Sequence, residues 1–167
     1  MRLIVKGTGH DYIGRSIAPN SLSIWTHHMK GIDYHLGSFS PHGCSDPIEG
    51  NAVTARAGIQ MADLYEYLDA YGETVVGGTS KTVGVGGYLT GGGHSLLSAR
   101  NGLAADQVLE MEVVTPDGEH VVANEYQNED IFWAMRGVGY HIPHTQRNVL
   151  THRRAAAPRL ASSRRRP

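Results

Sequence analysis

A histidine and three glycines follow the first apolar run of the chain: Gly7, Gly9, His10 and Gly14. The run itself, Leu3–Val5, consists of β-formers and predicts a strand buried on both faces. Glycines let the backbone turn sharply and bring successive N–H groups close to an anion, so the loop suits a pyrophosphate. The dinucleotide motif G-x-G-x-x-G would need a glycine at Tyr12, and the P-loop motif is absent here, which disfavours those nucleotide-binding folds. An ordinary glycine-rich turn beside a solvent-facing histidine is the alternative interpretation.

A second glycine-rich block covers residues 74–106 and has nine glycines between Gly77 and Gly102. Each glycine costs about 1 kcal/mol relative to alanine inside a helix, so a regular helix is not expected. Close contact of the backbone with a large flat ligand would offset this cost. A flexible linker is the alternative, but linkers are seldom this apolar. The apolar residues are Val75, Val76, Val83, Val85, Leu89, Leu96 and Leu97.

Both blocks resemble one family of FAD-binding domains. The segment Val5–Ser16 is similar to the pyrophosphate loop of the vanillyl-alcohol-oxidase or p-cresol-methylhydroxylase (PCMH) type, most closely in the fungal berberine-bridge-enzyme-like oxidases. The second block carries the resemblance more specifically. Its matching residues are Thr82–Gly87, Gly91–Gly93, Arg100 and Gly102–Asp106, and the later segment Asn128–Gly137 matches as well.

The resemblance implies an FAD-linked oxidoreductase that moves a hydride from an organic substrate to flavin, with molecular oxygen as electron acceptor. A role in secondary metabolism or in alcohol or carbohydrate oxidation is expected. In this family a histidine at the place of His10 usually forms a covalent bond to the flavin 8α-methyl carbon. Ser80 replaces the cysteine that some members attach to flavin C6, and Lys81 replaces a proline, so we expect covalent attachment through His10 alone.

The resemblance also implies which residues contact FAD. They are Lys6, Gly7, Thr8, Gly9, His10, Asp11, Gly14, Ser16, Thr79, Ser80, Gly84, Gly86, Gly87, Thr90, Gly91, Gly92 and Gly93. No catalytic base is assigned, although His94 and Tyr88 lie in the right block.

The order of predicted elements indicates an α+β fold. Strands are expected at 21–26, 32–35, 52–58, 108–115 and 120–123, a helix at 59–71, and a short helix at 131–135 capped by residues 128–130. Residues 37–50 are expected to form a surface loop. The resemblance implies a PCMH-type core, with a small parallel βαβ part and an antiparallel sheet flanked by helices. It covers about 1–137 and lacks the family's substrate domain, so the chain looks truncated.

The net charge of −1 is the sum of two regions of the chain with opposite net charges. Residues 1–140 hold eight basic and all sixteen acidic residues, which gives −8, whereas 141–167 hold seven arginines and no acid, which gives +7. We therefore expect a partial FAD-binding domain at 1–140 and a disordered, arginine-rich tail at 141–167 that does not match the family. An inactive remnant that binds acidic partners or nucleic acid through this tail is the alternative function, with nucleic acid the less favoured.

Several other classes of protein are disfavoured. The single cysteine, Cys44, supports neither an internal disulfide nor a zinc site, and no H-E-x-x-H motif occurs among the ten histidines, so no metal is expected. No apolar run reaches the roughly 18 residues of a membrane span, and the N-terminus has no signal-peptide pattern. A membrane partner is therefore not expected; full-length members of the resembling family are often secreted, and the location of this chain is left open.

Overall fold

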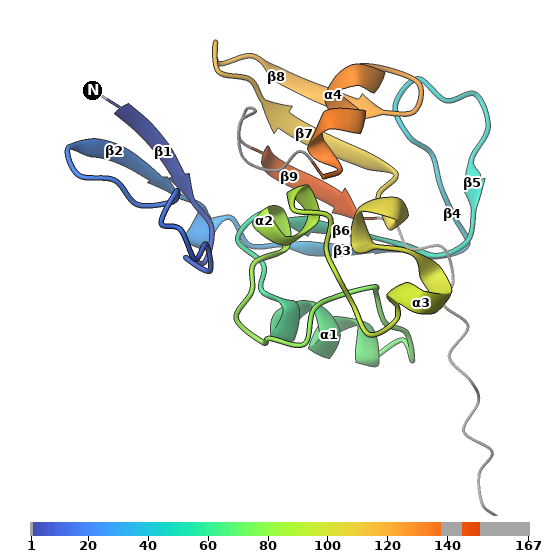
Figure 1. Ribbon diagram of the computed structural model, residues 1–167. Coiled ribbons are helices and arrows are strands. Elements are labelled where there is room, and N and C mark those ends of the chain that lie inside the picture. Colours follow the sequence, from blue (N-terminus) through green and yellow to red (C-terminus); the bar gives the residue numbers. More distant parts are fainter. Residues whose placement is uncertain (1, 138–144, 151–167) are drawn as a thin grey trace, which may run out of the picture.

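The computed structural model describes residues 2–137 and 145–150 (Figure 1). Its largest sheet has five strands, and every neighbouring pair is antiparallel. The order across this sheet is β3 (Ile32–His35), β6 (Ala52–Arg56), β9 (Thr145–Leu150), β7 (Glu110–Val114) and β8 (His120–Asn124). The α+β class is thereby confirmed.

A separate parallel pair is formed by β1 (Arg2–Lys6) and β2 (Ser21–Trp25) and lies beside the larger sheet in Figure 1. Leu3 is paired with Leu22 and Val5 with Ile24, so apolar residues of both strands share one face. The residues 7–20 that join the strands contain turns and no helix. A third, short antiparallel pair is β4 (Ser38–Phe39) with β5 (Ile48–Glu49), inside the predicted surface loop.

Helices cover the sheet and close the core. The longest is α1 (Met61–Asp69), whose Met61, Leu64 and Leu68 are buried at helical spacing. The other helical segments are η1 (Thr26–His28), α2 (Val85–Thr90), α3 (Ser98–Asn101), η2 (Ala104–Gln107) and α4 (Glu129–Met135). The expectation of no regular helix in the second glycine-rich block is wrong for α2, whose Val85 and Leu89 are buried and anchor it in the core. α2 packs against β6, and α4 packs against β8. In the described part of the chain, none of the helices has the length and apolar character needed to span a bilayer.

The expectation that all of 141–167 is unpaired is wrong for Thr145–Leu150. This segment is β9, which lies between β6 and β7 and pairs with both. Without it both neighbours would present unpaired backbone N–H and C=O groups along an open edge, and a strand of any side-chain pattern can satisfy them. The expectation relied on side-chain periodicity, which backbone pairing does not need. Residues 141–144 and 151–167 lie outside the described residues.

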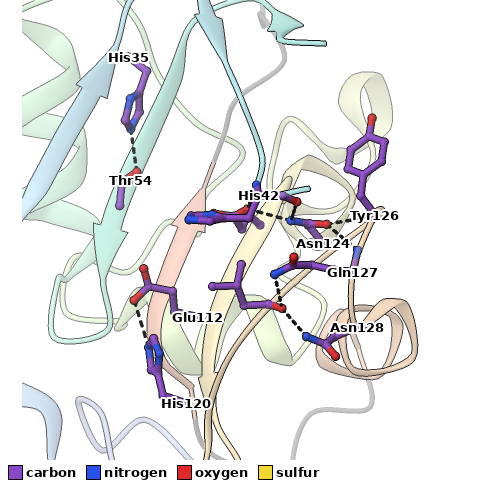
Figure 2. A network of polar contacts seen from close by, with 11 residues as sticks. His35, His42, Thr54, Glu112, His120, Asn124, Tyr126, Gln127 and Asn128 are labelled. Atoms are coloured by element: carbon purple, nitrogen blue, oxygen red, sulfur yellow. Dashed lines mark hydrogen bonds and ion pairs between the residues drawn. The ribbon is translucent and has the colours of Figure 1, made fainter. Parts of the chain in front are cut away.

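A buried polar network holds the loop 37–50 against the sheet (Figure 2). The carboxylate of Glu110, 2% exposed, accepts hydrogen bonds from the His42 backbone N–H at 2.7 Å, from His42 Nδ1 at 2.9 Å and from Asn124 Nδ2 at 2.8 Å. Asn124, fully buried, also donates to the His42 carbonyl at 2.9 Å. Its Oδ1 accepts from the backbone N–H groups of Tyr126 and Gln127. The loop is therefore fixed to β7 and β8 by side chains that the sequence pattern did not single out.

The predicted cap of α4 is wrong in its mechanism. Asn128 occupies the N-cap position, but its backbone is left-handed at φ 52° and its side chain makes no hydrogen bond to the helix. Instead, Asn128 Nδ2 donates to the Val122 carbonyl of β8 at 2.7 Å (Figure 2). Asn128 therefore ties the helix entrance to the sheet, while Glu129 and Asp130 place negative charge in the first turn of the helix.

Candidate functional site

The two glycine-rich blocks meet at one cavity of about 540 Å³. The first block enters it from the end of β1, and the second enters through the turn before α2 and through the end of α2. The predicted residues that line the cavity are Gly7, Thr8, Gly9, His10, Asp11, Ser16, Gly84, Gly86, Gly87, Thr90, Gly91 and Gly93. The volume lies within the range of roughly 300–1,000 Å³ typical of sites for small molecules and cofactors.

Positive backbone angles and an ion pair shape the first loop. Gly9 has φ 82° and Gly14 has φ 73°, a region that residues with a Cβ rarely adopt. Asp11 forms an ion pair with Arg15 four residues later, and it also accepts the Arg15 backbone N–H. The hydrogen bonds from Arg15 hold the pKa of Asp11 below its usual value. The loop is thus closed on itself by its own residues.

Two hydrogen bonds from side chains join the first block to the second. The hydroxyl of Thr8 accepts the backbone N–H of Gly84 at 2.9 Å. His10 Nε2 lies 2.8 Å from the Thr82 hydroxyl oxygen. Residues that are 76 and 72 positions apart in the chain are therefore in direct contact at the cavity wall.

The glycines of the site serve two different purposes. A Cβ at Gly93 would lie 2.6 Å from Ala104 Cβ, so packing inside the protein requires glycine there, and one at Gly84 would make a tight contact of 3.0 Å with Thr8 Cγ2. A Cβ at Gly7 or Gly87 would meet no protein atom within 4 Å, although both residues line the cavity. Absence of a side chain at these two positions leaves room for a ligand rather than for a neighbour. This open cradle fits a flat cofactor with a pyrophosphate.

Five of the predicted cofactor-binding residues do not line the cavity: Lys6, Gly14, Thr79, Ser80 and Gly92. Lys6 is directed elsewhere, because its ammonium group lies 5.3 Å from the centre of the Trp25 ring. Trp25 in turn donates its indole N–H to the Gly7 carbonyl at 2.9 Å and so supports the loop from outside. Contact of the five residues with FAD remains a prediction.

Tyr88 and His94, the two residues considered as catalytic bases, are differently placed. Tyr88 lines the cavity, and its hydroxyl donates to the His94 carbonyl at 2.6 Å. Burial, with a smaller contribution from Tyr65, raises the pKa of Tyr88 to about 12. Its phenol is therefore protonated at neutral pH and suits a hydrogen-bond donor rather than a base. The side chain of His94 is exposed and does not line the cavity.

Sequence reasoning missed several residues of the cavity wall. These are Val5, Tyr12, Ile13, Arg15, Thr26, Ala57, Val83 and Met135, together with Tyr88 as a wall residue. The spacing of Arg15 and Asp11, four residues apart, was the available signal for the ion pair in the loop. Thr26 comes from η1, Ala57 directly follows β6, and Met135 ends α4, and no local pattern connects such distant segments to the site.

Residues 1–124 match the FAD binding domain family. The chain therefore belongs to this family, whose cofactor is FAD. It is 51% identical over 141 residues to an uncharacterized FAD-linked oxidoreductase of Arthroderma benhamiae, covering 83% of this chain and 24% of that protein. It is 52% identical over 141 residues to aurantioclavine synthase of Penicillium expansum, covering 83% and 30%. The chain thus spans about a quarter of the length of the curated relatives that it matches.

Solved structures agree with this assignment. The VAO-type flavoprotein MtVAO615 from Myceliophthora thermophila superposes with a TM-score of 0.80 at 40% identity, covering 91% of this chain and 27% of that one. The glucooligosaccharide oxidase of Acremonium strictum, described with a 6-S-cysteinyl, 8α-N1-histidyl FAD, superposes with a TM-score of 0.72 at 26% identity, covering 90% and 30%. The fold is that of the vanillyl-alcohol-oxidase type, as the sequence resemblance implied.

Proposed function

We propose that this chain forms the FAD-holding part of an oxidase and that His10 is the point of covalent attachment to the flavin. The substrate would be a small organic molecule of secondary metabolism, or an alcohol or carbohydrate. When bound, FAD supplies the hydride acceptor for substrate oxidation. Molecular oxygen would then take up the electrons.

Different residues of the cavity would bind different parts of FAD. The backbones of Gly7, Thr8 and Gly9 would face the pyrophosphate, because a turn rich in glycine can direct several N–H groups at one anion. The open space beside Gly87 would admit the flavin ring. Thr8 would keep the two blocks at a fixed separation through its hydrogen bond to Gly84.

One observation carries the proposal: two glycine-rich blocks that are distant in sequence line a single cavity and are joined at its wall by hydrogen bonds. A linker or an isolated turn would not produce this arrangement. The family to which the chain belongs and the open positions at Gly7 and Gly87 agree with FAD as the occupant.

The experiment is reconstitution of the purified chain with FAD, followed by the visible absorption spectrum before and after denaturation in acid. We expect flavin absorbance in the folded protein and yellow colour that remains with the denatured polypeptide. His10→Ala should still bind FAD but release all of it in acid. Failure of the wild-type chain to bind FAD would contradict the cofactor site, and colour retained by His10→Ala would contradict the attachment point.

A further inference from the structure

The hydrogen bond between His10 and Thr82 occupies one nitrogen of the histidine ring. Nε2 lies 2.8 Å from Thr82 Oγ1. Among the described residues, Nδ1 of His10 has no hydrogen-bond or ion-pair partner, and His10 lines the cavity whereas Thr82 does not. The ring is thus held on one side, and its other nitrogen is unoccupied.

The backbone that carries Thr82, whose side chain is exposed, is held in place. The carbonyls on both sides of it accept backbone N–H groups from the start of α1: Lys81 from Ala62 at 3.0 Å and Val83 from Met61 at 2.9 Å. The next peptide N–H, that of Gly84, donates to Thr8 in the first block. Thr82 is therefore presented to His10 from a backbone that is fixed on both sides.

A neutral imidazole carries one N–H and one lone pair, and a threonine hydroxyl can accept the first or donate to the second. The nitrogen that bonds to a flavin must carry the lone pair, and Nδ1 is the ring nitrogen that the contact with Thr82 leaves open. We propose that Thr82 is a positioning residue that accepts the Nε2–H of His10 and so leaves the lone pair on Nδ1 as the nucleophile toward the flavin 8α-methyl carbon. This inference rests on the proposed function, in which His10 carries the flavin.

The chemistry of attachment balances with oxygen as the oxidant. His10 Nδ1 forms a bond to the methyl carbon, one C–H bond of the methyl group breaks, and the ring loses its Nε2 proton past the Thr82 hydroxyl to solvent. The electron pair of the broken C–H bond passes to the flavin, together with the methyl proton and one proton taken up from solvent in place of the Nε2 proton released to it. Molecular oxygen then takes the pair and the protons as hydrogen peroxide.

The test compares Thr82→Val, Thr82→Ser and Thr54→Val with the wild-type chain. Valine at 82 keeps the shape of threonine and removes the hydroxyl, and serine keeps the hydroxyl. Thr54→Val is the matched control, because it removes the hydroxyl from a second histidine–threonine pair, His35 Nε2 to Thr54 Oγ1 at 2.8 Å, that does not line the cavity (Figure 2). Two readouts are used: the ¹⁵N NMR shifts of the His10 ring without flavin, and the rate at which FAD becomes resistant to removal by acid.

We expect the wild-type chain, Thr82→Ser and Thr54→Val to show His10 protonated at Nε2 and to attach FAD at the same rate. Thr82→Val should show a mixture of the two tautomers and attach FAD about tenfold more slowly, the scale of one hydrogen bond. The flavinylated peptide should carry its bond at Nδ1. A wild-type tautomer and rate in Thr82→Val, or a bond at Nε2, would overturn the proposal. If the wild-type chain binds no FAD, the proposed function fails, and the ring shifts still decide the role of Thr82.

Discussion

A single buried residue, Glu110, connects the loop 37–50 to the sheet. Its carboxylate lies on β7 and receives three hydrogen bonds, two of them from His42 of the loop 37–50. A buried polar group costs little when it is satisfied, but loss of one partner leaves the others unpaired in a medium of low dielectric constant. The residue is acidic and stands in a strand pattern, so nothing in its sequence neighbourhood separates it from a solvent-facing glutamate.

Replacement of Glu110 by leucine should therefore lower the free energy of unfolding by about 3 kcal/mol, because the N–H groups of His42 and Asn124 lose their acceptor. Urea denaturation followed by circular dichroism measures the change. Glu125→Leu is the control, since Glu125 is exposed and should change stability by less than about 0.5 kcal/mol. Equal effects of the two substitutions would contradict the role given to the network.

The raised pKa of Tyr88 predicts that the folded chain loses stability at alkaline pH. Its pKa is raised from 10.0 to about 12 in the folded chain, mainly by burial. Below pH 10 the folded and unfolded forms both keep the phenolic proton, and the stabilisation is fully present. As the pH rises from 10 toward 12, the unfolded chain loses the proton while the folded chain keeps it, so the free energy of unfolding falls. Denaturation at a series of pH values should show this fall, and Tyr88→Phe should remove part of it; an unchanged profile would contradict the assignment.

At the scale of elements, glycine positions separate packing from ligand space. A Cβ at Gly58, just after β6, would lie 2.1 Å from the Thr26 carbonyl oxygen. This oxygen belongs to the backbone, so the clash could be relieved only by a shift of η1 or β6. A Cβ at Gly87 in α2 would meet nothing within 4 Å, yet Gly87 lines the cavity. The two glycines should thus respond in opposite ways to the same substitution.

Gly87→Ala should raise the free energy of unfolding of the flavin-free chain by roughly 0.5–1 kcal/mol, because alanine is the better helix former. The same substitution should weaken FAD binding at least about tenfold, since the methyl group enters the cavity. Gly58→Ala should lower stability by about 3 kcal/mol through the backbone clash. Thermal unfolding and FAD titration measure both variants. Unchanged FAD affinity in a folded Gly87→Ala chain would place the flavin elsewhere.

The sequence predicted elements well where a local pattern exists and failed where a distant partner decides. The spacing of Met61, Leu64 and Leu68 predicted α1, and the turn at 116–119 predicted the hairpin of β7 and β8. β9 could not be found, because its place depends on the gap between β6 and β7 rather than on its own periodicity. The family resemblance implied that the two glycine-rich blocks meet at the cofactor. The hydrogen bond between His10 and Thr82 has no sequence signal, because the two residues are 72 positions apart.

For the whole molecule, the parallel pair β1–β2 exposes an apolar face. Leu3 and Leu22 are paired across the strands and are 52% and 51% exposed, and Ile24 on the same face is 39% exposed. The alternation at 21–26 predicted a half-buried strand, but its apolar side faces solvent. Parallel sheets are normally covered on both faces, so this face should favour association.

We accordingly expect the chain to self-associate as its concentration rises, and Leu22→Lys to reduce this association by placing a charge on the exposed face. Sedimentation velocity at several concentrations measures the effect. Ser23→Lys, on the opposite face of the same strand, is the matched control and should leave association closer to that of the wild type. A monomeric wild-type chain at all concentrations would contradict the importance of this face.

Turnover by the chain of 167 residues requires more than a bound flavin. Oxidation of a substrate needs a base within hydrogen-bond reach of the substrate proton and a pocket that excludes water. Tyr88, a polar wall residue, keeps its proton to about pH 12 and donates it to the His94 carbonyl, so it supplies no base at neutral pH. The curated relatives are more than three times as long, and we propose that their additional length supplies both the base and the cover.

The chain loaded with FAD should therefore oxidise a panel of alcohols and carbohydrates no faster than free FAD at neutral pH, measured as hydrogen peroxide released under air. The His10→Ala chain loaded with FAD is the control for flavin that is bound without a covalent link, and it should be equally inactive. Steady turnover above the rate of free FAD would show that a base lies within these residues. Loss of that turnover in Tyr88→Phe would then identify Tyr88 as the group in contact with the substrate, because the substitution removes only its hydroxyl.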